Sequence, residues 1–191
     1  MKAVPANRYF VFFSIAIGGC LIDLATKRWM FDWLGMPREK PTYWVWNHVF
    51  GFQTSLNEGA LFGMGQGMVV VFAVLSVAAA VGVLCWLFWA GAARDRLLTV
   101  ALGCVTAGIF GNLYDRTGMP GLTWNYGNQW HEIGEPVYAV RDWILVMIGR
   151  WPWPNFNVAD SLLVCGAAML VWHALFAQQR AEDSPVEQEA P

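Results

Sequence analysis

The stretch from residue 68 to residue 93 contains no charged side chain. As an α-helix it would be about 39 Å long, more than the roughly 30 Å hydrocarbon core of a bilayer. Three other apolar runs, at residues 9–25, 97–113 and 158–177, come close to the same requirement. Backbone in contact with lipid must satisfy its own hydrogen bonds, so we expect all four runs to be transmembrane helices. The sequence therefore predicts a mainly α membrane protein.

Composition agrees with this class. Hydrophobic residues make up 57% of the 191 residues and charged residues 14%, against roughly 25% charged residues in an ordinary soluble domain. A net charge of −2 leaves no basic surplus for nucleic acid, which we exclude as a partner. The four cysteines lie in apolar runs without a CxxC spacing, and the three histidines are scattered. We therefore expect neither a metal site nor a cofactor.

Four spans place both termini and the hairpin 91–96 on one side, and the long loops 27–67 and 114–157 on the other. Lys and Arg are concentrated in the short segments of the first side, which places the termini in the cytoplasm. The long loops hold nine of the 12 Trp, as expected at a membrane interface. We expect one domain over residues 1–177 and a disordered cytoplasmic tail over 178–191, which is polar and acidic.

The long loops themselves show some order. Residues 43–56 alternate in a way that indicates strands, and an apolar rhythm resumes over 137–148. We expect a small extracytoplasmic β-sheet or cradle, with the irregular remainder of the second loop as a long loop or lid.

Polar residues gather where the spans end on the side of the long loops. Ionisable groups inside spans are costly to insert and indicate function by default. Three pairs each share a helix face because their members are three or four residues apart. The pairs are Asp23 and Lys27, Asn112 and Arg116, and Asn157 and Asp160. Asp115 and two loop residues, Asn57 and Asp142, complete the set.

Two carboxylates brought together at such a boundary would suit aspartic hydrolysis, because one of them is then protonated and the other ionised. From spacing alone, other interpretations remain open. Asp160 could cap a helix N-terminus, Asp142 could form a surface ion pair, and Asp115 could be an interfacial anchor or itself pair with Asp160.

Five stretches resemble the bacterial lipoprotein signal peptidase family (signal peptidase II). In chain order they are Asp23-Leu-Ala-Thr-Lys27, Asn57-Glu-Gly-Ala-Leu-Phe-Gly63, Gly111-Asn-Leu-Tyr-Asp-Arg116, Val140-Arg-Asp142-Trp-Ile and Phe156-Asn-Val-Ala-Asp160. The resemblance covers residues 9–177. It implies an aspartic endopeptidase of the cytoplasmic (inner) membrane that removes the signal peptide of diacylglyceryl-modified prolipoproteins just before the lipidated Cys.

The resemblance also implies roles for residues. The catalytic pair is Asp142 and Asp160, which overrules pairing Asp115 with Asp160. Substrate would contact Asn57, Gly59, Asn112, Arg116 and Asn157, with Asp23, Lys27 and Asp115 as supporting residues. The partners implied are prolipoprotein substrates and membrane lipids, and the protein would act as a monomer with its active site on the outer face.

The chain departs from the family pattern at three places. Leu61 stands where the family has a second Ala, and Trp143 where it has Phe. In addition, residues 117–141 separate Arg116 from Asp142, where the family has only a handful of residues. We expect this insertion to form an enlarged lid over the site.

Two rival functions are weighed against the peptidase. The segment Ile17-Gly-Gly-Cys20 resembles a lipobox, which would make the chain itself a lipoprotein, but three further spans follow it. Alternatively, the chain is a non-catalytic scaffold or channel whose polar cluster holds helices together by hydrogen bonds.

Overall fold

The computed structural model describes residues 3–59 and 65–182, with side chains through residue 176. The helices are α1 (Ala6–Leu34), α2 (Val69–Leu84) with a π-helical continuation η2 (Cys85–Trp89), the 3₁₀ turn η3 (Ala92–Arg94), α3 (Arg96–Arg116) and α4 (Val158–Glu182). The strands are β1 (Tyr43–Trp46), β2 (Phe50–Asn57), β3 (Val140–Ile148) and β4 (Trp151–Pro152). Within the described residues, 4 helices are long and apolar enough to cross a membrane. The expected class, a mainly α membrane protein with a small sheet, is confirmed.

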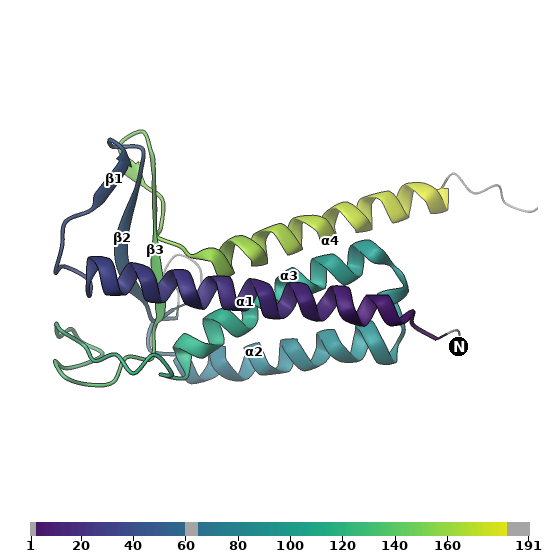
Figure 1. Cartoon of the computed structure of the whole chain (residues 1–191), viewed down its shortest axis with the longest axis horizontal. Helices are drawn as coiled ribbons and strands as arrows, with labels where there is room; N and C mark the ends of the chain where they lie inside the picture. The colour runs from purple at the N-terminus through teal and green to yellow at the C-terminus, as the bar shows by residue number, and fades with distance from the viewer. Residues whose placement is uncertain (1–2, 60–64, 183–191) are drawn as a thin grey trace, which may run out of the picture.

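The four long helices form a bundle around α3 (Figure 1). In an apolar 18-residue stretch of α3, 56% of the residues are buried, against 17% or less in the corresponding stretches of the other three long helices. The outer helices therefore turn apolar side chains outward, as a lipid environment requires. The start of α1 and the end of α4 lie at one end of the bundle, and the sheet and the loop 117–139 lie at the other (Figure 1).

Helix α1 is longer than the expected span of 9–25. It runs through Asp23 and Lys27, which were expected to close it, and ends only where Gly35 adopts a φ of 78°. Asp23 and Lys27 are both fully buried and form an ion pair of 2.8 Å. The two charges do not end the helix because they satisfy each other inside the bundle, so the first long loop begins after Leu34 and not at Lys27.

Two other boundaries also differ. The second helical span ends at Trp89, because Gly91 takes a left-handed conformation with a φ of 81° and starts the hairpin. At the C-terminus, α4 continues to Glu182, five residues into the segment expected to be disordered. Residues 178–182 are Gln, Gln, Arg, Ala and Glu, all favourable in helices. The rest of that expected tail, 183–191, lies outside the described residues.

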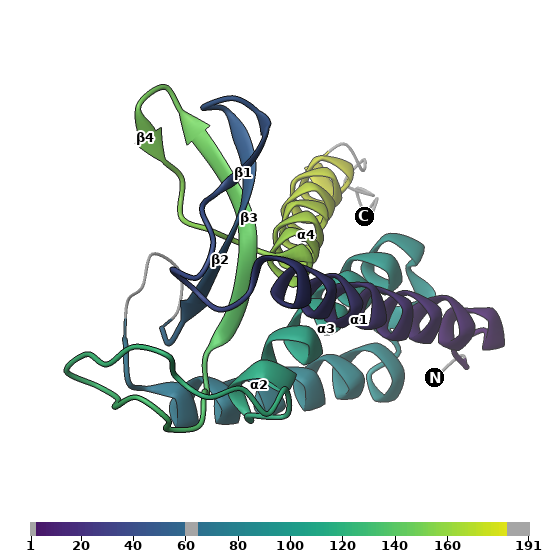
Figure 2. The same cartoon turned by 60° about the vertical axis from the view of Figure 1, so that its left-hand side comes forward.

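The two long loops meet in one antiparallel sheet with strand order β1-β2-β3-β4. The central pairing joins β2 of the first loop to β3 of the second, with Ser55 opposite Asp142 and Asn57 opposite Val140. Figure 2 shows the sheet standing at the end of the bundle, away from the bundle axis. Aromatic side chains at its far edge are exposed, including Trp46 at 68% and Trp151 at 78%.

A buried ionic cluster ties the sheet end of the bundle together. At its centre, the Lys27 ammonium lies 2.8 Å from Asp23 Oδ2 and 3.0 Å from Asp115 Oδ2. It also donates to Asn112 Oδ1 at 2.9 Å. None of the side chains of Lys27, Asp23 and Asp115 is exposed. One ammonium thus joins α1 to α3 where a bilayer would leave no water to solvate the charge.

The cluster extends to β3 and α4. Arg141 donates to Asp115 Oδ1 from Nε at 2.9 Å and from Nη2 at 2.8 Å, a two-pronged contact. Asp23 Oδ1 accepts the backbone N–H of Ala159 at 2.8 Å. Lys27 and Arg141 supply two positive charges against two negative ones, so the cluster is neutral as a whole.

Glycine allows the helices to approach this closely. A Cβ at Gly111 would lie 2.4 Å from Asp23 Oδ2, and one at Gly108 would lie 2.5 Å from the backbone oxygen of Ala159. Both distances are shorter than real Cβ contacts, so α3 needs glycine at the two positions that face Asp23 and the start of α4.

Replacing Lys27 with Met should lower the free energy of unfolding by about 3–5 kcal/mol, because two buried carboxylates lose their shared cation. The measurement is equilibrium unfolding in detergent micelles. Arg28→Met is the matched control: that side chain is 81% exposed and pairs with Asp32 at 3.5 Å, so its loss should cost less than about 1 kcal/mol. Equal effects of the two substitutions would contradict a stabilising role for the cluster.

Candidate active site

Asp142 follows Arg141 in β3, so the contact of Arg141 with Asp115 fixes its backbone. Its side chain is 2% exposed. Asn157 Nδ2 donates to Asp142 Oδ1 at 2.6 Å, and the Asn57 side chain forms a further hydrogen bond to it. Burial, followed by the negative charge of Asp160, raises the pKa of Asp142 well above its ordinary value. Asp142 therefore holds a proton more readily than an ordinary aspartate.

Asp160 follows Ala159 in the first turn of α4, so the contact of Ala159 with Asp23 fixes its backbone in turn. Asp160 Oδ2 accepts the backbone N–H of Asn157 at 3.1 Å, and Asn157 Oδ1 accepts the backbone N–H of Asp160 at 2.9 Å. This reciprocal pair is a capping box at the N-terminus of α4. Asn112 Nδ2 donates to the other oxygen, Asp160 Oδ1, at 2.8 Å.

Asn157 links the two carboxyl groups. Its amide nitrogen donates to Asp142 Oδ1. Its amide oxygen accepts the backbone N–H of Asp160, and its own backbone N–H donates to Asp160 Oδ2. The same nitrogen lies 3.3 Å from Asn112 Oδ1, the atom that also accepts from Lys27. Through these two asparagines, both carboxyl groups are connected to the buried ionic cluster.

Three other expected residues border this centre. Arg116, at the end of α3, donates from Nη2 to the backbone oxygen of Gly59 at 3.1 Å. Asn57 Oδ1 accepts the backbone N–H of Gly59 at 3.0 Å, which holds the chain in a turn directly after β2. Arg116 Nε is buried without a hydrogen-bond partner among the described residues. The positive charge of Arg116 lies near enough to Asp160 and Asp142 to interact with both.

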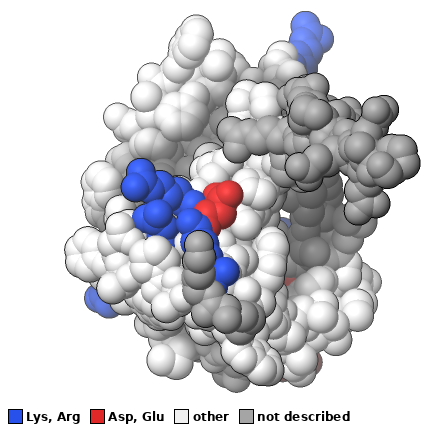
Figure 3. Space-filling model, turned by 90° about the vertical axis from the view of Figure 1, so that its right-hand side faces the viewer, with Lys and Arg blue, Asp and Glu red and all other residues white. Residues whose placement is uncertain are grey.

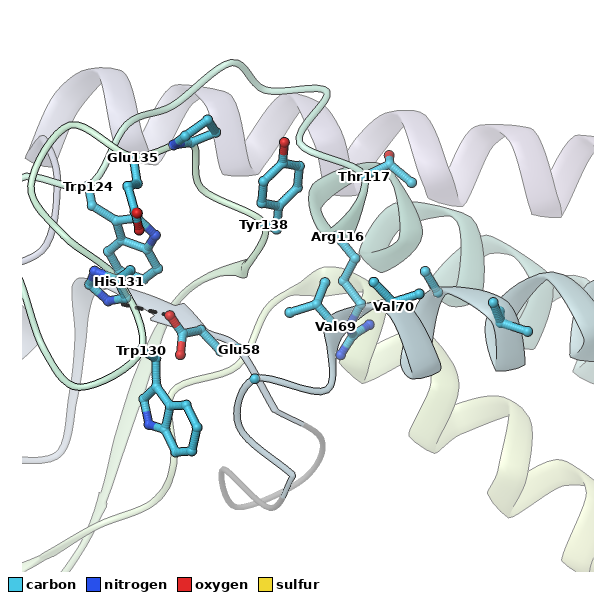
Figure 4. A pocket seen from close by; sticks show the side chains of 14 residues that line it. Glu58, Val69, Val70, Arg116, Thr117, Trp124, Trp130, His131, Glu135 and Tyr138 are labelled. Atoms are coloured by element: carbon cyan, nitrogen blue, oxygen red, sulfur yellow. Dashed lines mark ion pairs between the residues drawn. The ribbon is translucent and has the colours of Figure 1, made fainter.

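A cavity of about 740 Å³ adjoins Arg116 (Figure 4). Its walls are apolar residues of α2, among them Val69 and Val70, and residues of the loop 117–139, among them Trp124 and Tyr138. Figure 4 shows the loop side chains facing α2 across this space, with an ion pair between Glu58 and His131 at one end. The loop expected to act as a lid therefore forms one wall of a space next to the site.

The structure also separates the open interpretations. Asp115 is fully buried and pairs directly with Lys27 and Arg141, not with Asp160, which it reaches only through Lys27 and Asn112. Asp142 is buried and so is not part of a surface ion pair. Asp160 does cap a helix, as one interpretation held, and it also accepts a hydrogen bond from Asn112 on α3. The three residues expected to have a supporting role form the buried ionic cluster: Asp23, Lys27 and Asp115.

Sequence reasoning missed three residues of this region. Arg141 was known only as a neighbour of Asp142, although it anchors β3 to Asp115. Glu58 lies inside the family stretch 57–63 but was given no role of its own, and His131 belongs to no motif. Among the described residues, no group of three or more His, Cys, Asp or Glu side chains is placed to hold a metal ion.

Comparisons with known proteins place the chain in a family. The family model for signal peptidase (SPase) II, Peptidase_A8, matches residues 15–176. The lipoprotein signal peptidase of Rhodopirellula baltica is 50% identical over 88% of this chain and 73% of its own length. That of Polynucleobacter necessarius is 31% identical over 92% of this chain and 93% of its own length.

Solved structures show the same fold. A bacterial membrane enzyme determined by the in meso method at 2.3 Å resolution superposes with a TM-score of 0.73 at 22% identity, covering 92% of this chain and 94% of that one. Four spanning helices, a small antiparallel sheet and a family match over most of the sequence agree: this multi-pass membrane protein belongs to the signal peptidase II family of proteases.

Proposed function

We propose that this protein is an aspartic endopeptidase that cleaves the signal peptide from diacylglyceryl-modified prolipoproteins just before the lipidated Cys. Membership of the signal peptidase II family supports the substrate class. The proposal of an aspartic type rests on Asn157, which forms hydrogen bonds with both Asp142 and Asp160. In addition, burial and the charge of Asp160 raise the pKa of Asp142. One carboxyl group protonated beside one ionised is the arrangement that general acid–base hydrolysis uses.

In the proposed reaction, Asp160 acts as the base and Asp142 as the acid. The Asp160 carboxylate takes a proton from water as the water oxygen bonds to the scissile carbonyl carbon, and Asp142 gives its proton to the carbonyl oxygen. When the tetrahedral intermediate collapses, the C–N bond breaks and the leaving nitrogen takes the proton now held by Asp160. Asp142 recovers its proton from the hydroxyl group as the new carboxyl group forms, so both residues return to their starting states.

Of the residues expected to contact substrate, we keep Asn57, Gly59 and Arg116 in that role. Asn112 and Asn157 are buried and hold the two carboxyl groups instead. Arg116 lines the cavity, and we assign to its guanidinium the binding of a backbone or ester carbonyl of the substrate. A diacylglyceryl anchor would fix the depth of the neighbouring Cys in the membrane and so lower the entropic cost of positioning the scissile bond.

We further propose that the protein lies in the cytoplasmic (inner) membrane as a monomer surrounded by lipid, with both termini in the cytoplasm and the active site on the outer face. Figure 3 looks onto the end of the bundle where α1 begins and shows Lys and Arg side chains gathered in one area; Arg8, Arg94 and Arg96 belong to that end. At the opposite end, Lys27 and Arg141 are neutralised inside the cluster. The exposed Arg38, Lys40 and Arg150 of that end are spread over long loops, whereas Arg8, Arg94 and Arg96 lie in short segments beside the spans. This difference in density favours a cytoplasmic position for the termini.

Asp142→Asn and Asp160→Asn should each lower the rate of prolipoprotein cleavage by at least about 100-fold, because each removes one partner of the acid–base pair. Purified variants in detergent, assayed on a diacylglyceryl-modified prolipoprotein, provide the measurement. Asp32→Asn is the control, since Asp32 is 69% exposed and pairs with Arg28. A non-catalytic scaffold predicts no cleavage by the wild type, and parental cleavage by either Asn variant would refute the assigned pair.

The raised pKa of Asp142 predicts a pH dependence. The protonated acid is required for cleavage, so kcat should fall as pH rises through the pKa of folded Asp142. Stability should change in the same sense: between its ordinary pKa and its raised one, Asp142 binds more proton in the folded than in the unfolded state, so the free energy of unfolding falls as pH rises. The wild type should lose stability relative to Asp142→Asn over that window. A stability difference that does not change with pH would contradict the assignment of the proton to Asp142.

A further inference from the structure

An ion pair joins the loop 117–139 to Glu58, the residue that follows β2, beside an apolar contact of Leu56 with Trp124, Val137 and Ala139. His131 Nε2 lies 3.4 Å from Glu58 Oε1, and the two side chains are only 4% and 13% exposed. Figure 4 shows this pair at the end of the cavity, with His131 reaching Glu58 from the loop. The pair is ionic when His131 is protonated, and its enclosure then leaves little water to screen the attraction.

The loop holds His131 in place before any substrate arrives. The imidazole stacks on the Trp124 ring with centroids 3.4 Å apart and planes 8° from parallel. Asn128 Oδ1 accepts the backbone N–H groups of Trp130 and His131, at 2.6 and 3.2 Å. Trp124 is fixed in turn by backbone hydrogen bonds with Glu135 and Gly134, at 2.9 and 2.8 Å. The ring of His131 thus has a defined position.

Glu58 lies between two residues that touch the active-site centre. Asn57 bonds to the Asp142 carboxyl group, and the backbone oxygen of Gly59 accepts from Arg116. A shift of Glu58 along the chain would displace both neighbours. Burial raises the pKa of Glu58, and the charge of His131 acts in the opposite sense and favours the carboxylate.

We propose that the Glu58–His131 pair is a positioning device: the loop 117–139 uses it to hold the Asn57–Gly59 segment where Asn57 orients Asp142 and Gly59 orients Arg116. The proposal rests on the proposed function, since it concerns the alignment of the acid in that reaction. Glu58 and His131 touch no reacting atom in this account, and their effect on the rate passes through Asn57 and Gly59. Through this pair, the loop 117–139 contributes to catalysis in addition to lining the cavity.

A double-mutant cycle tests the proposal on the full-length protein in detergent with a diacylglyceryl-modified prolipoprotein. Glu58→Gln and His131→Asn should each lower kcat about tenfold with KM changed less than about twofold, and the double variant should be no slower than either single one, because both remove the same contact. Glu58→Asp, which keeps the charge, should retain more of kcat than Glu58→Gln. Glu132→Gln and His48→Asn, at exposed positions, are the matched controls and should cleave at the parental rate.

Independent, additive losses, a rise in KM alone, or parental kcat in Glu58→Gln would overturn the proposal. The melting temperature of each variant separates a loss of folding from a loss of alignment, and Glu58→Asp keeps the test informative if Glu58→Gln melts early. Failure of the wild type to cleave the prolipoprotein would overturn the proposed function and the positioning role with it. Cleavage by the wild type together with variants that behave like the controls would overturn the positioning role alone.

Discussion

The buried ammonium of Lys27 is the interaction on which the rest of the structure depends. It binds Asp23 and Asp115, and these two carboxylates each hold a second element: Asp115 holds Arg141 of β3, and Asp23 holds the backbone of Ala159 at the start of α4. The next residue after Arg141 is Asp142, and the next after Ala159 is Asp160. One cation on α1 therefore sets where two distant segments of the chain present their carboxyl groups.

Charge divides four aspartates at this end of the bundle, Asp23, Asp115, Asp142 and Asp160, into two kinds. Asp23 and Asp115 are fully enclosed and neutralised by Lys27 and Arg141, so their charges stabilise the bundle. Asp142 and Asp160 have amide donors from Asn57, Asn112 and Asn157 instead of a neutralising cation in contact. Repulsion between them, added to burial, raises the pKa of Asp142. This raised pKa is what the proposed role of Asp142 as the acid requires.

Much of the fold was predictable because apolar runs report directly on the membrane, and the polar residues at the span ends marked the site. The extent of α1 was not predictable, since Asp115, the partner that keeps Lys27 inside the bundle, lies far away in sequence. The β2–β3 register, which sets Asn57 beside Asp142, joins two loops and leaves no local signal. His131 lies in an insertion without a motif, and its role depends on a stacking contact with Trp124 that composition does not reveal.

The most direct test of the account is the titration of the Asp142 carboxyl carbon by ¹³C NMR, in the wild type and in Asp160→Asn. The pKa of Asp142 should lie above the ordinary range in the wild type and should be lower in the variant, because the Asp160 charge has been removed. An ordinary pKa for Asp142, or a raised pKa that is unchanged when Asp160 is neutralised, would show that the two carboxyl groups do not act as a pair.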